Sequence, residues 1–516
     1  MKIERTKNAA RNILFDGALK LYDLLVPLVM RSLILYYLGV EYMGLSGLFT
    51  SILSFLNLAE LGVGAAMVFS MYKPIAEDDT ETICALMKLY RTIYRVIGLF
   101  IAVVGLALTP FLNNLVHNGV PDGMNLYILY YMNLASTVLT YWLFAYKNCL
   151  LHAHQRTHVG SKIGLVVNAV QNVVKILMLV LFKNYYLYLA TQLLSQVVQN
   201  ILVASKVTKL YPNYVPRGVL PKEKKQNIIQ RVRDLFTAKF SGVILNSADT
   251  LVISSHLGLT PLALYQNYFY IVSALRGMMY IALSACKAGI GNSLITESTE
   301  KNFYDLRKLS FMFNWMLAVS STMLLCMYQP FMRIWMGEQY LLDASCVLCF
   351  VLYFYFYEMT LMVNLYKDAA GIWHKDRFRP LTASLVNLGL NLATVSWLGL
   401  YGVLLSTVVS VLFIELPWLL HNLFHEVFPI GYLAKYVRDL CVYLAISACS
   451  CTSAWFLCGS FMLNDWLQLL ACGGISFLIP CALFLLFFVK TKLFRDSLSI
   501  IKKIVPTGKQ RAELPS

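Results

Sequence analysis

Four charged residues interrupt the first long apolar stretch of the sequence, at intervals of four, three and eight residues. These residues are Asp16, Lys20, Asp23 and Arg31. At about 100° per residue, Asp16, Lys20 and Arg31 lie within roughly 80° of one another on a helix, and Asp23 borders them. The stretch therefore predicts a helix that is apolar over most of its surface but carries one charged stripe along its length.

A second pair of cations repeats this spacing far along the chain. Arg276 and Lys287 are eleven residues apart, as are Lys20 and Arg31. Eleven residues make about three turns of an α-helix, so the members of each pair share a face. Lysine and arginine both bind phosphate, and arginine does so with two parallel hydrogen bonds. The two pairs therefore predict a path for a hydrophilic anion or for the anionic head group of a lipid.

Further charges lie in other apolar stretches, and together they give two sets of candidate site residues. We expect five cations to contact the anionic ligand: Lys20, Arg31, Lys239, Arg276 and Lys287. We expect five acids to be charge partners of these cations or sites for a coupling ion: Asp16, Asp23, Glu60, Asp249 and Glu358.

Simpler interpretations of these charges stay open. Asp16 and Lys20, four residues apart, could neutralise each other. Glutamates inside apolar stretches could be purely structural partners of cations, and these are Glu60, Glu358 and Glu415. Lysines near the ends of apolar stretches could extend to lipid head groups. The lysines to which this last interpretation applies are Lys147, Lys175, Lys287 and Lys367.

The composition identifies the medium in which these charges lie. Of the 516 residues, 58% are hydrophobic and only 14% are charged, whereas a soluble domain carries about 25% charged residues. The mean hydropathy is +0.62. This composition excludes a disordered chain and a small disulfide-stapled module, and it indicates a polytopic helical membrane protein. The twelve cysteines lie almost entirely in apolar stretches, where we expect small buried side chains rather than metal ligands.

A helix needs about 20 apolar residues to cross a bilayer, and the sequence contains fourteen candidate spans. They cover residues 12–37, 44–71, 96–112, 125–150, 163–182, 187–205, 235–257, 265–291, 309–328, 344–368, 380–398, 402–424, 439–460 and 466–489.

The distribution of the 43 lysines and arginines predicts the orientation of these spans. With the N-terminus inside, the outside loops contain only Lys183 and Arg333. Because inside loops of membrane proteins carry an excess of lysine and arginine, we expect both termini to be cytoplasmic.

The first two spans match the seventh and eighth when the chain is shifted by 219 residues. Leu38-Gly39 then falls on Leu257-Gly258, and Lys20 falls on Lys239. The match predicts an all-α fold with two six-helix bundles in parallel pseudo-repeat plus two C-terminal helices. The predicted parts are an N-terminal bundle (1–208), a basic cytoplasmic linker (209–234), a C-terminal bundle (235–424), two additional helices (439–489) and a cytoplasmic tail (490–516).

The sequence offers little for catalysis. It has no nucleotide-binding loop of the G-x-x-x-x-G-K-[ST] type and no stretch outside the spans that could form a catalytic domain. A membrane polymerase would have a large outside loop, and a membrane acyltransferase would have a histidine within a span. We therefore expect a transporter rather than an enzyme, with no resident cofactor. A non-transporting scaffold, which would have little use for a charged path, is a weaker alternative.

Three local motifs carry a resemblance to a known family. They are the opening Lys7–Asn12 (KNAARN), the segment Tyr37–Leu45 (YLGVEYMGL) and the segment Leu56–Gly64 (LNLAELGVG). With the fourteen spans, they resemble the polysaccharide transporter branch of the multidrug/oligosaccharidyl-lipid/polysaccharide (MOP) superfamily. This branch contains Wzx-type flippases for O-antigen and capsule repeat units, and lipid II flippases are similar to it.

The resemblance implies two bundles around a central cavity whose opening alternates between the two sides of a bacterial plasma membrane. It implies a polyprenyl-diphosphate-linked oligosaccharide as cargo, moved from the cytoplasmic to the outer leaflet. By span, Arg31 and Arg276 match the cationic positions of the lipid II flippases, and the last two spans match those that shape a groove for the lipid tail. The expected partners are membrane lipids and the polymerase and glycosyltransferases of the same pathway.

The energy source and one rival function stay open. Coupling to Na⁺, to H⁺ or to the membrane potential would each fit the resemblance. The rival is a cation-coupled multidrug exporter of the same fold, in which Asp23, Asp249 or Glu358 would bind the ion or the drug.

Overall fold

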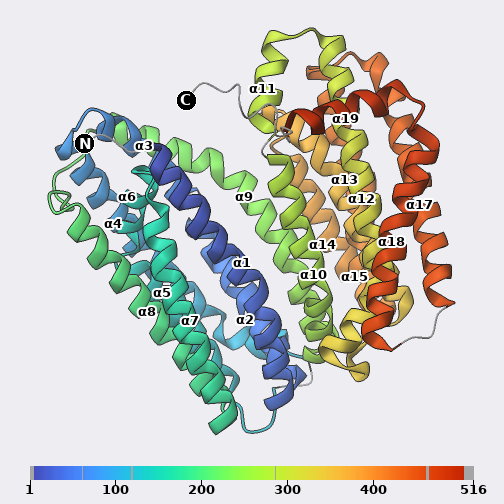
Figure 1. The fold of residues 1–516 in the computed structure, drawn as a ribbon. Helices are drawn as coiled ribbons and strands as arrows, with labels where there is room; N and C mark the ends of the chain where they lie inside the picture. Colours follow the sequence, from blue (N-terminus) through green and yellow to red (C-terminus); the bar gives the residue numbers. More distant parts are fainter. Residues whose placement is uncertain (1–4, 61, 118–119, 285, 461–463, 505–516) are drawn as a thin grey trace. The chain divides into compact units, whose positions relative to one another are not determined.

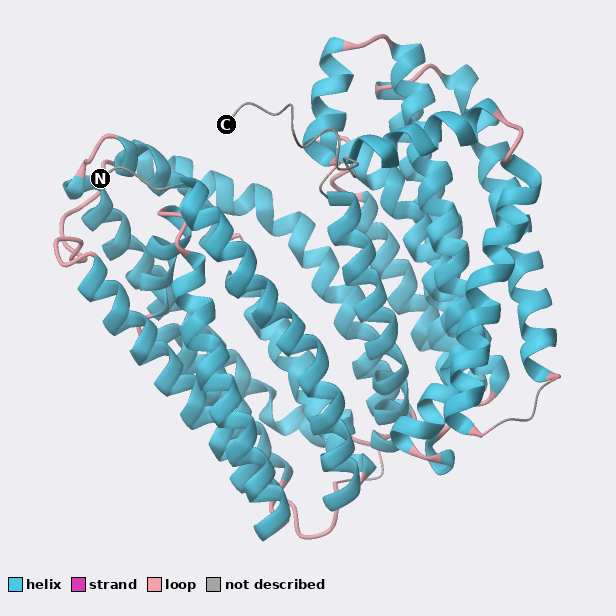
Figure 2. Cartoon of the chain, viewed as in Figure 1, coloured by secondary structure: helices cyan, strands magenta, loops and turns pink. Residues whose placement is uncertain are grey.

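The computed structural model describes residues 5–60, 62–117, 120–284, 286–460 and 464–504, and Figure 1 traces their path. Throughout these ranges the chain forms helices and loops without a strand (Figure 2). The all-α architecture predicted from the sequence is thus confirmed. Two compact units divide the chain, Met1–Gln266 and Asn267–Ser516, which we call unit 1 and unit 2.

Unit 1 contains nine helices and the beginning of a tenth. They are α1 (Arg5–Tyr37), α2 (Val40–Leu56), α3 (Val63–Ala76), α4 (Thr80–Leu108), α5 (Leu126–Trp142), α6 (Asn148–Ala153), α7 (Thr157–Phe182), α8 (Tyr185–Leu210), α9 (Lys222–His256) and the start of α10 (Leu259–Ser284). Helix α9 begins inside the predicted linker 209–234 and packs against α2 and α3. The bundle boundaries predicted from the repeat stay a prediction.

Unit 2 contains the rest of α10 and nine further helices. They are α11 (Lys287–Thr296), α12 (Thr299–Met336), α13 (Ala344–Ala369), α14 (Arg379–Leu398), α15 (Leu400–Ser410), α16 (Leu416–Glu426), α17 (Leu433–Gly459), α18 (Asp465–Phe488) and α19 (Lys492–Ile504). Helices α12, α17 and α18 pack on one another, and the rings of Trp315 and Phe484 stack between them. Within the predicted tail, α19 packs on α12, where the Tyr304 hydroxyl donates to Asp496 over 2.8 Å.

Within the described residues, nine helices are long and apolar enough to cross a membrane, or ten if α5 and its bent continuation form one span. The other predicted spans fall on α1, on α2 with α3, on α9 and on α10. The charged stripe lowers the hydropathy of α1, and α2 and α3 are each shorter than a full span. The chain is therefore a multi-pass membrane protein. Its more polar helices include α1, α9 and α10, which carry most of the predicted ligand cations.

Two spans of unit 1 are broken, and the breaks are tied together. After α2, a 3₁₀ turn from Asn57 to Glu60 leads to Gly62, whose φ of +89° favours glycine. The segment that ends in α6 is bent by 46° from α5, near Phe144 with φ +60°. The Tyr141 hydroxyl, at the end of α5, donates to Asn57 over 3.1 Å and to Glu60 over 3.0 Å. The two breaks therefore lie side by side.

Small residues bring α2 close to the start of α10. A Cβ atom at Gly44 would overlap the backbone carbonyl of Leu259, and one at Gly47 would overlap the side chain of Gln266. Both glycines belong to the region that carries the family resemblance or follow it directly. Their lack of a side chain lets the helices approach to backbone contact.

Candidate functional site

Arg276 of α10 lies in a cage of one carboxylate and two tyrosines. Its Nε donates to Glu358 Oε1 of α13 over 3.1 Å, and its Nη1 donates to the Tyr353 hydroxyl over 2.9 Å. The guanidinium carbon lies 3.7 Å from the ring centre of Tyr357, a close cation–π contact. The predicted ligand Arg276 and the predicted acid Glu358 are thus brought together.

Because this ion pair is buried, separating its two charges is costly. The side chains of Arg276 and Glu358 are 18% and 3% exposed. The second carboxylate oxygen of Glu358, Oε2, is buried without a hydrogen-bond partner among the described residues. Removing one partner of such a pair leaves an uncompensated buried charge, at a cost of about 3–5 kcal/mol. Any anion that takes Arg276 must therefore compete with Glu358.

A further cation, Lys175 of α7, lies beside Tyr188 of α8 in unit 1. The predicted ligand Arg31 belongs to the same unit, on α1. Lys175 of α7 donates to Gln192 Oε1 over 2.9 Å, and its Nζ lies 4.3 Å from the centre of the Tyr188 ring. Lys175 is 5% exposed, so it does not extend to head groups. That interpretation is wrong for this residue, and the site gains a cation that is not among the five predicted ligands.

The other predicted cations lie apart from these two groups. Lys20 is exposed on α1, and the side chain of Lys239 on α9 lies outside the described residues. Lys287 begins α11 rather than continuing α10, and its Nζ is 3.5 Å from Asp368 Oδ2. Arg276 and Lys287 thus have different acidic partners within unit 2.

Two of the predicted acids accept hydrogen bonds from neutral groups, and a third is exposed. Asp16 accepts hydrogen bonds from Thr157 over 2.6 Å and from Ser161 over 2.5 Å, both on α7. The described partners of Asp16 are therefore these two hydroxyl groups and not Lys20. Asp249 is 6% exposed and accepts from Tyr265 over 3.2 Å. Asp23 is exposed on α1.

Glu60 lies at the break between α2 and α3 and is held by tyrosines. Tyr94 donates to Oε1 over 2.6 Å, Tyr141 donates to Oε2 over 3.0 Å, and Tyr90 donates to Tyr94 over 2.6 Å. A cavity of about 570 Å³ adjoins this carboxylate. Its polar lining consists of Glu60, Tyr72, Tyr90, Tyr94, Asn148 and His152. Broken helices are where transporters commonly place coupling-ion sites.

Unit 2 contains a buried ionic network of which the sequence indicated only Glu415, as a structural partner of a cation. Arg379 donates to both oxygens of Asp376, over 2.7 and 2.8 Å, and to Glu415 Oε1 over 2.6 Å. Lys367, which was expected near head groups, is instead 8% exposed and lies 3.0 Å from Asp376. Burial tends to raise the pKa of Asp376, but the hydrogen bonds and charges of Arg379 and Lys367 outweigh it and hold the pKa below its usual value.

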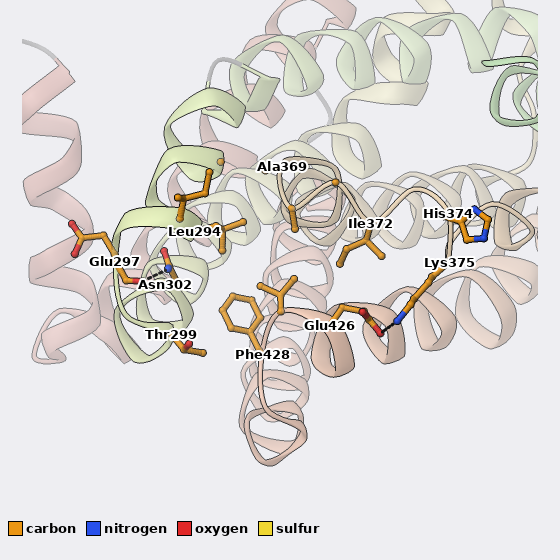
Figure 3. Close-up of a pocket in the computed structure, with 15 residues that line it drawn as sticks. Leu294, Glu297, Thr299, Asn302, Ala369, Ile372, His374, Lys375, Glu426 and Phe428 are labelled. Atoms are coloured by element: carbon orange, nitrogen blue, oxygen red, sulfur yellow. Dashed lines mark hydrogen bonds and ion pairs between the residues drawn. The ribbon is translucent and has the colours of Figure 1, made fainter. Parts of the chain in front are cut away.

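Beside this network is a cavity of about 600 Å³, shown in Figure 3. It lies between α11, the end of α13 and the end of α16, with Leu294, Ala369 and Phe428 in its lining. Lys375 and Glu426 form an ion pair of 2.6 Å at one side. The lining mixes both charge signs with apolar groups, so it does not by itself indicate a ligand.

The fold is similar to those of solved membrane transporters. No protein-family model and no curated protein sequence matches the chain, but solved structures do. A lipid II flippase MurJ in an inward closed conformation has a TM-score of 0.68 at 16% identity, covering 92% of this chain and 99% of its own. An inward-facing multidrug resistance MATE family transporter of the MOP superfamily has a TM-score of 0.61 at 16% identity, covering 81% and 96%.

A third structure, a MOP superfamily transporter from Pyrococcus furiosus, has a TM-score of 0.50 at 14% identity, covering 83% of this chain and 96% of its own. The likeness to these transporters agrees with the fold expected from the resemblance. At these identities the likeness concerns the fold alone, and the Wzx-type branch stays a prediction.

Proposed function

We propose that the protein is a flippase that moves a polyprenyl-diphosphate-linked oligosaccharide from the cytoplasmic to the outer leaflet of a bacterial plasma membrane. The fold, shared with a lipid II flippase and with multidrug transporters, supports movement of a cargo through alternating access. The observation that supports an anionic head group on the cargo is the position of Arg276. This arginine lies within a membrane helix, and its only carboxylate partner among the described residues is Glu358. In this proposal the chain acts as a transporter and not as an enzyme.

The proposed binding step is an exchange of anions on Arg276. A diphosphate accepts two parallel hydrogen bonds from the guanidinium, replacing the single bond to Glu358. Tyr353 and Tyr357 keep the guanidinium in place during the exchange. Lys20, Arg31, Lys239 and Lys287 supply further positive charge along the path, and the prenyl tail stays in the lipid.

The exchange links cargo to protons. A carboxylate that is 3% exposed and has lost its counter-ion is unstable within a membrane, so Glu358 takes up one proton as the diphosphate binds. A diphosphate that carries more than one negative charge still moves net negative charge outward. The membrane potential favours this by about 2.3 kcal/mol per charge per 100 mV. Na⁺ coupling at Glu60, Asp23 or Asp249 is the alternative.

Native mass spectrometry of the protein extracted from its own membrane tests the cargo. We expect an adduct whose fragments contain a polyprenyl diphosphate, and we expect Arg276→Ala to remove it. Lys301→Ala is the matched control, because Lys301 is an exposed cation of the same unit whose partner, Glu297, is four residues away. If the adduct survives in the double variant Arg31→Ala/Arg276→Ala, the site assignment is wrong while the cargo class stands.

One observation favours a second function. The carboxylate of Glu60 beside a cavity of about 570 Å³ would suit a cation or a cationic drug, as in a multidrug exporter of the same fold. Drug-resistance assays in cells that express wild type or Glu60→Gln distinguish the two. Resistance that depends on Glu60, without a diphosphate adduct, would favour the exporter.

The proposed setting follows from the same function. We place both termini in the cytoplasm of a bacterium, because the excess of lysine and arginine lies on that side of the predicted spans. The polymerase and glycosyltransferases of the pathway are the proposed partners. Tagging of both ends with reporters that are active only in the cytoplasm tests the orientation.

A further inference from the structure

A groove on unit 1 combines a basic rim with an apolar floor. It has a volume of about 700 Å³ and lies where α1, α7 and α8 run next to one another (Figure 1). The basic residues in its lining are Arg11, His158, Lys162 and Lys206. The described lining contains no carboxylate. The nearest acid along α1, Asp16, has its oxygens occupied by Thr157 and Ser161.

The rim and the floor lie at different depths along the helices. Arg11, Lys162 and Lys206 are within about 9 Å of the helix ends, at a rise of 1.5 Å per residue. Val166 and Leu202 are about 12–14 Å from the same ends. These are the ends that the charge distribution assigns to the cytoplasm. The cations thus lie at the level of lipid head groups, and the apolar residues lie at the level of acyl chains.

The side chains of both layers are accessible. Arg11, Lys162 and Lys206 are exposed, and His158 is held in place by Asn12, whose Oδ1 lies 2.8 Å from its Nδ1. Val166 is 61% exposed and Leu202 is 46% exposed. Exposed apolar side chains directly below a cationic rim match a molecule that has an anionic head and hydrocarbon chains.

We propose that this groove is a binding site for an anionic glycerophospholipid of the cytoplasmic leaflet. The three exposed cations contact the phosphate, and the acyl chains lie along Val166 and Leu202. Basic pockets between transmembrane helices on the cytoplasmic side are sites for anionic lipid head groups. A volume of about 700 Å³ is larger than inorganic phosphate needs and is within the range of sites for small molecules. The site is separate from Arg276, which belongs to the other unit.

Native mass spectrometry of the full-length protein in detergent tests the site, with added phosphatidylglycerol, phosphatidylcholine of the same chain length, or inorganic phosphate. We expect phosphatidylglycerol to bind most tightly. Each lysine near an anionic lipid contributes about fivefold, so Lys162→Gln/Lys206→Gln should weaken phosphatidylglycerol binding about 30-fold. The control Lys222→Gln/Lys225→Gln removes the same charge from exposed positions of α9 and should change binding less than twofold.

A second variant distinguishes binding of a whole lipid from binding of its phosphate alone. Leu202→Trp fills the apolar floor without changing a charge, and we expect it to weaken phosphatidylglycerol binding at least fivefold. Unchanged binding in Leu202→Trp would overturn the proposal, as would equal affinity for phosphatidylcholine, equal loss in the control variant, or full competition by inorganic phosphate at the lipid's own concentration. Thermal unfolding in the same detergent verifies that each variant is folded, which is expected because the substituted side chains are exposed.

Discussion

In the described contacts, the buried arginines of unit 2 meet charges of opposite sign, whereas Glu60 and Lys175 of unit 1 meet hydroxyl, amide and aromatic groups. Arg276 pairs with Glu358, and Arg379 pairs with Asp376 and Glu415. In unit 1, Glu60 is held by tyrosines and Lys175 by Gln192 and Tyr188. In the contacts that the structure describes, neither Glu60 nor Lys175 forms an ion pair.

This difference separates two uses of buried charge. An ion pair neutralises itself, so it can hold helices together until a competing ion arrives. A lone charge held by neutral groups keeps its field, so it acts on whatever ion comes near. The ion pairs of unit 2 are therefore suited to exchange with a competing ion. The lone charges of unit 1 are suited to attracting an ion without exchange.

The largest effect that would test the contrast is the loss of Arg379. We expect Arg379→Met to leave Asp376 and Glu415 without their guanidinium and to lower the free energy of unfolding by about 3–5 kcal/mol. Thermal unfolding in detergent measures this. Lys375→Met is the control, because the Lys375–Glu426 pair is partly exposed and such pairs contribute about 0–1 kcal/mol. Equal effects of the two variants would contradict the distinction.

The pH dependence of unfolding gives an independent measurement of the same network. Since the folded protein holds the pKa of Asp376 below its usual value, the carboxylate stabilises the fold at pH values above about 4. That contribution is lost as the pH falls through the depressed pKa. We expect Asp376→Asn to be less stable than wild type at neutral pH and to approach it under acidic conditions. A difference that persists unchanged to low pH would assign the effect to packing.

The next effect concerns ligand affinity. Glu358→Gln removes the competing charge from Arg276, so we expect tighter binding of farnesyl diphosphate, by about tenfold or more. Arg276→Ala should have the opposite effect. Binding in wild type should also be accompanied by the uptake of about one proton, which isothermal titration in buffers of different ionisation enthalpy measures. Proton uptake that is unchanged in Glu358→Gln would remove this residue from the coupling.

A smaller loss is expected at the breaks of unit 1. Tyr141→Phe removes the hydroxyl whose single proton is shared between Asn57 and Glu60, at a cost of about 1 kcal/mol. Tyr131→Phe is the control, because the Tyr131 hydroxyl makes only a long contact of 3.4 Å with Thr109. Thermal unfolding distinguishes the two variants. If both lose the same stability, the two breaks are not tied by Tyr141.

The smallest effect has the opposite sign. Lys175→Met exchanges a buried charge that has only neutral partners for an apolar side chain of similar length, so the fold should be unchanged or up to about 1 kcal/mol more stable. If the charge of Lys175 is used for cargo, transport should fall while stability does not. A destabilised Lys175→Met would show that this lysine is a structural element like those of unit 2.

The sequence predicted the all-α membrane fold because apolar length and charge distribution depend only on neighbouring residues. It predicted Arg276 and Glu358 as functional residues because charges inside a span are conspicuous. It could not predict that the two meet, since 82 residues separate them and periodicity says nothing about pairs of helices. Lys175 was misjudged for the same reason: its depth along α7 could be read, but the burial supplied by α8 could not.

The breaks at Glu60 and Phe144 were also missed, although E-L-G-x-G contained the signal. Glu60 and Gly62, inside an apolar stretch, contributed to the family resemblance, but together they also indicate the end of a helix. The network around Arg379 was not predicted as a whole, because Arg379, Asp376 and Lys367 lie in a predicted loop or at the ends of spans, where charges are ordinary. Only Glu415, which lies inside a predicted span, was identified as a partner of a cation.

A continuous helix behaves as a rod and carries a displacement from one end to the other, whereas a helix with a break has a joint. In unit 1 the segments before the breaks, α2 and α5, contact each other, and so do the segments after them, α3 and α6. Tyr141 links the two joints at one level. Because α3 packs on α6 and the two breaks lie at one level, we expect a tilt of one of these segments to carry the other with it.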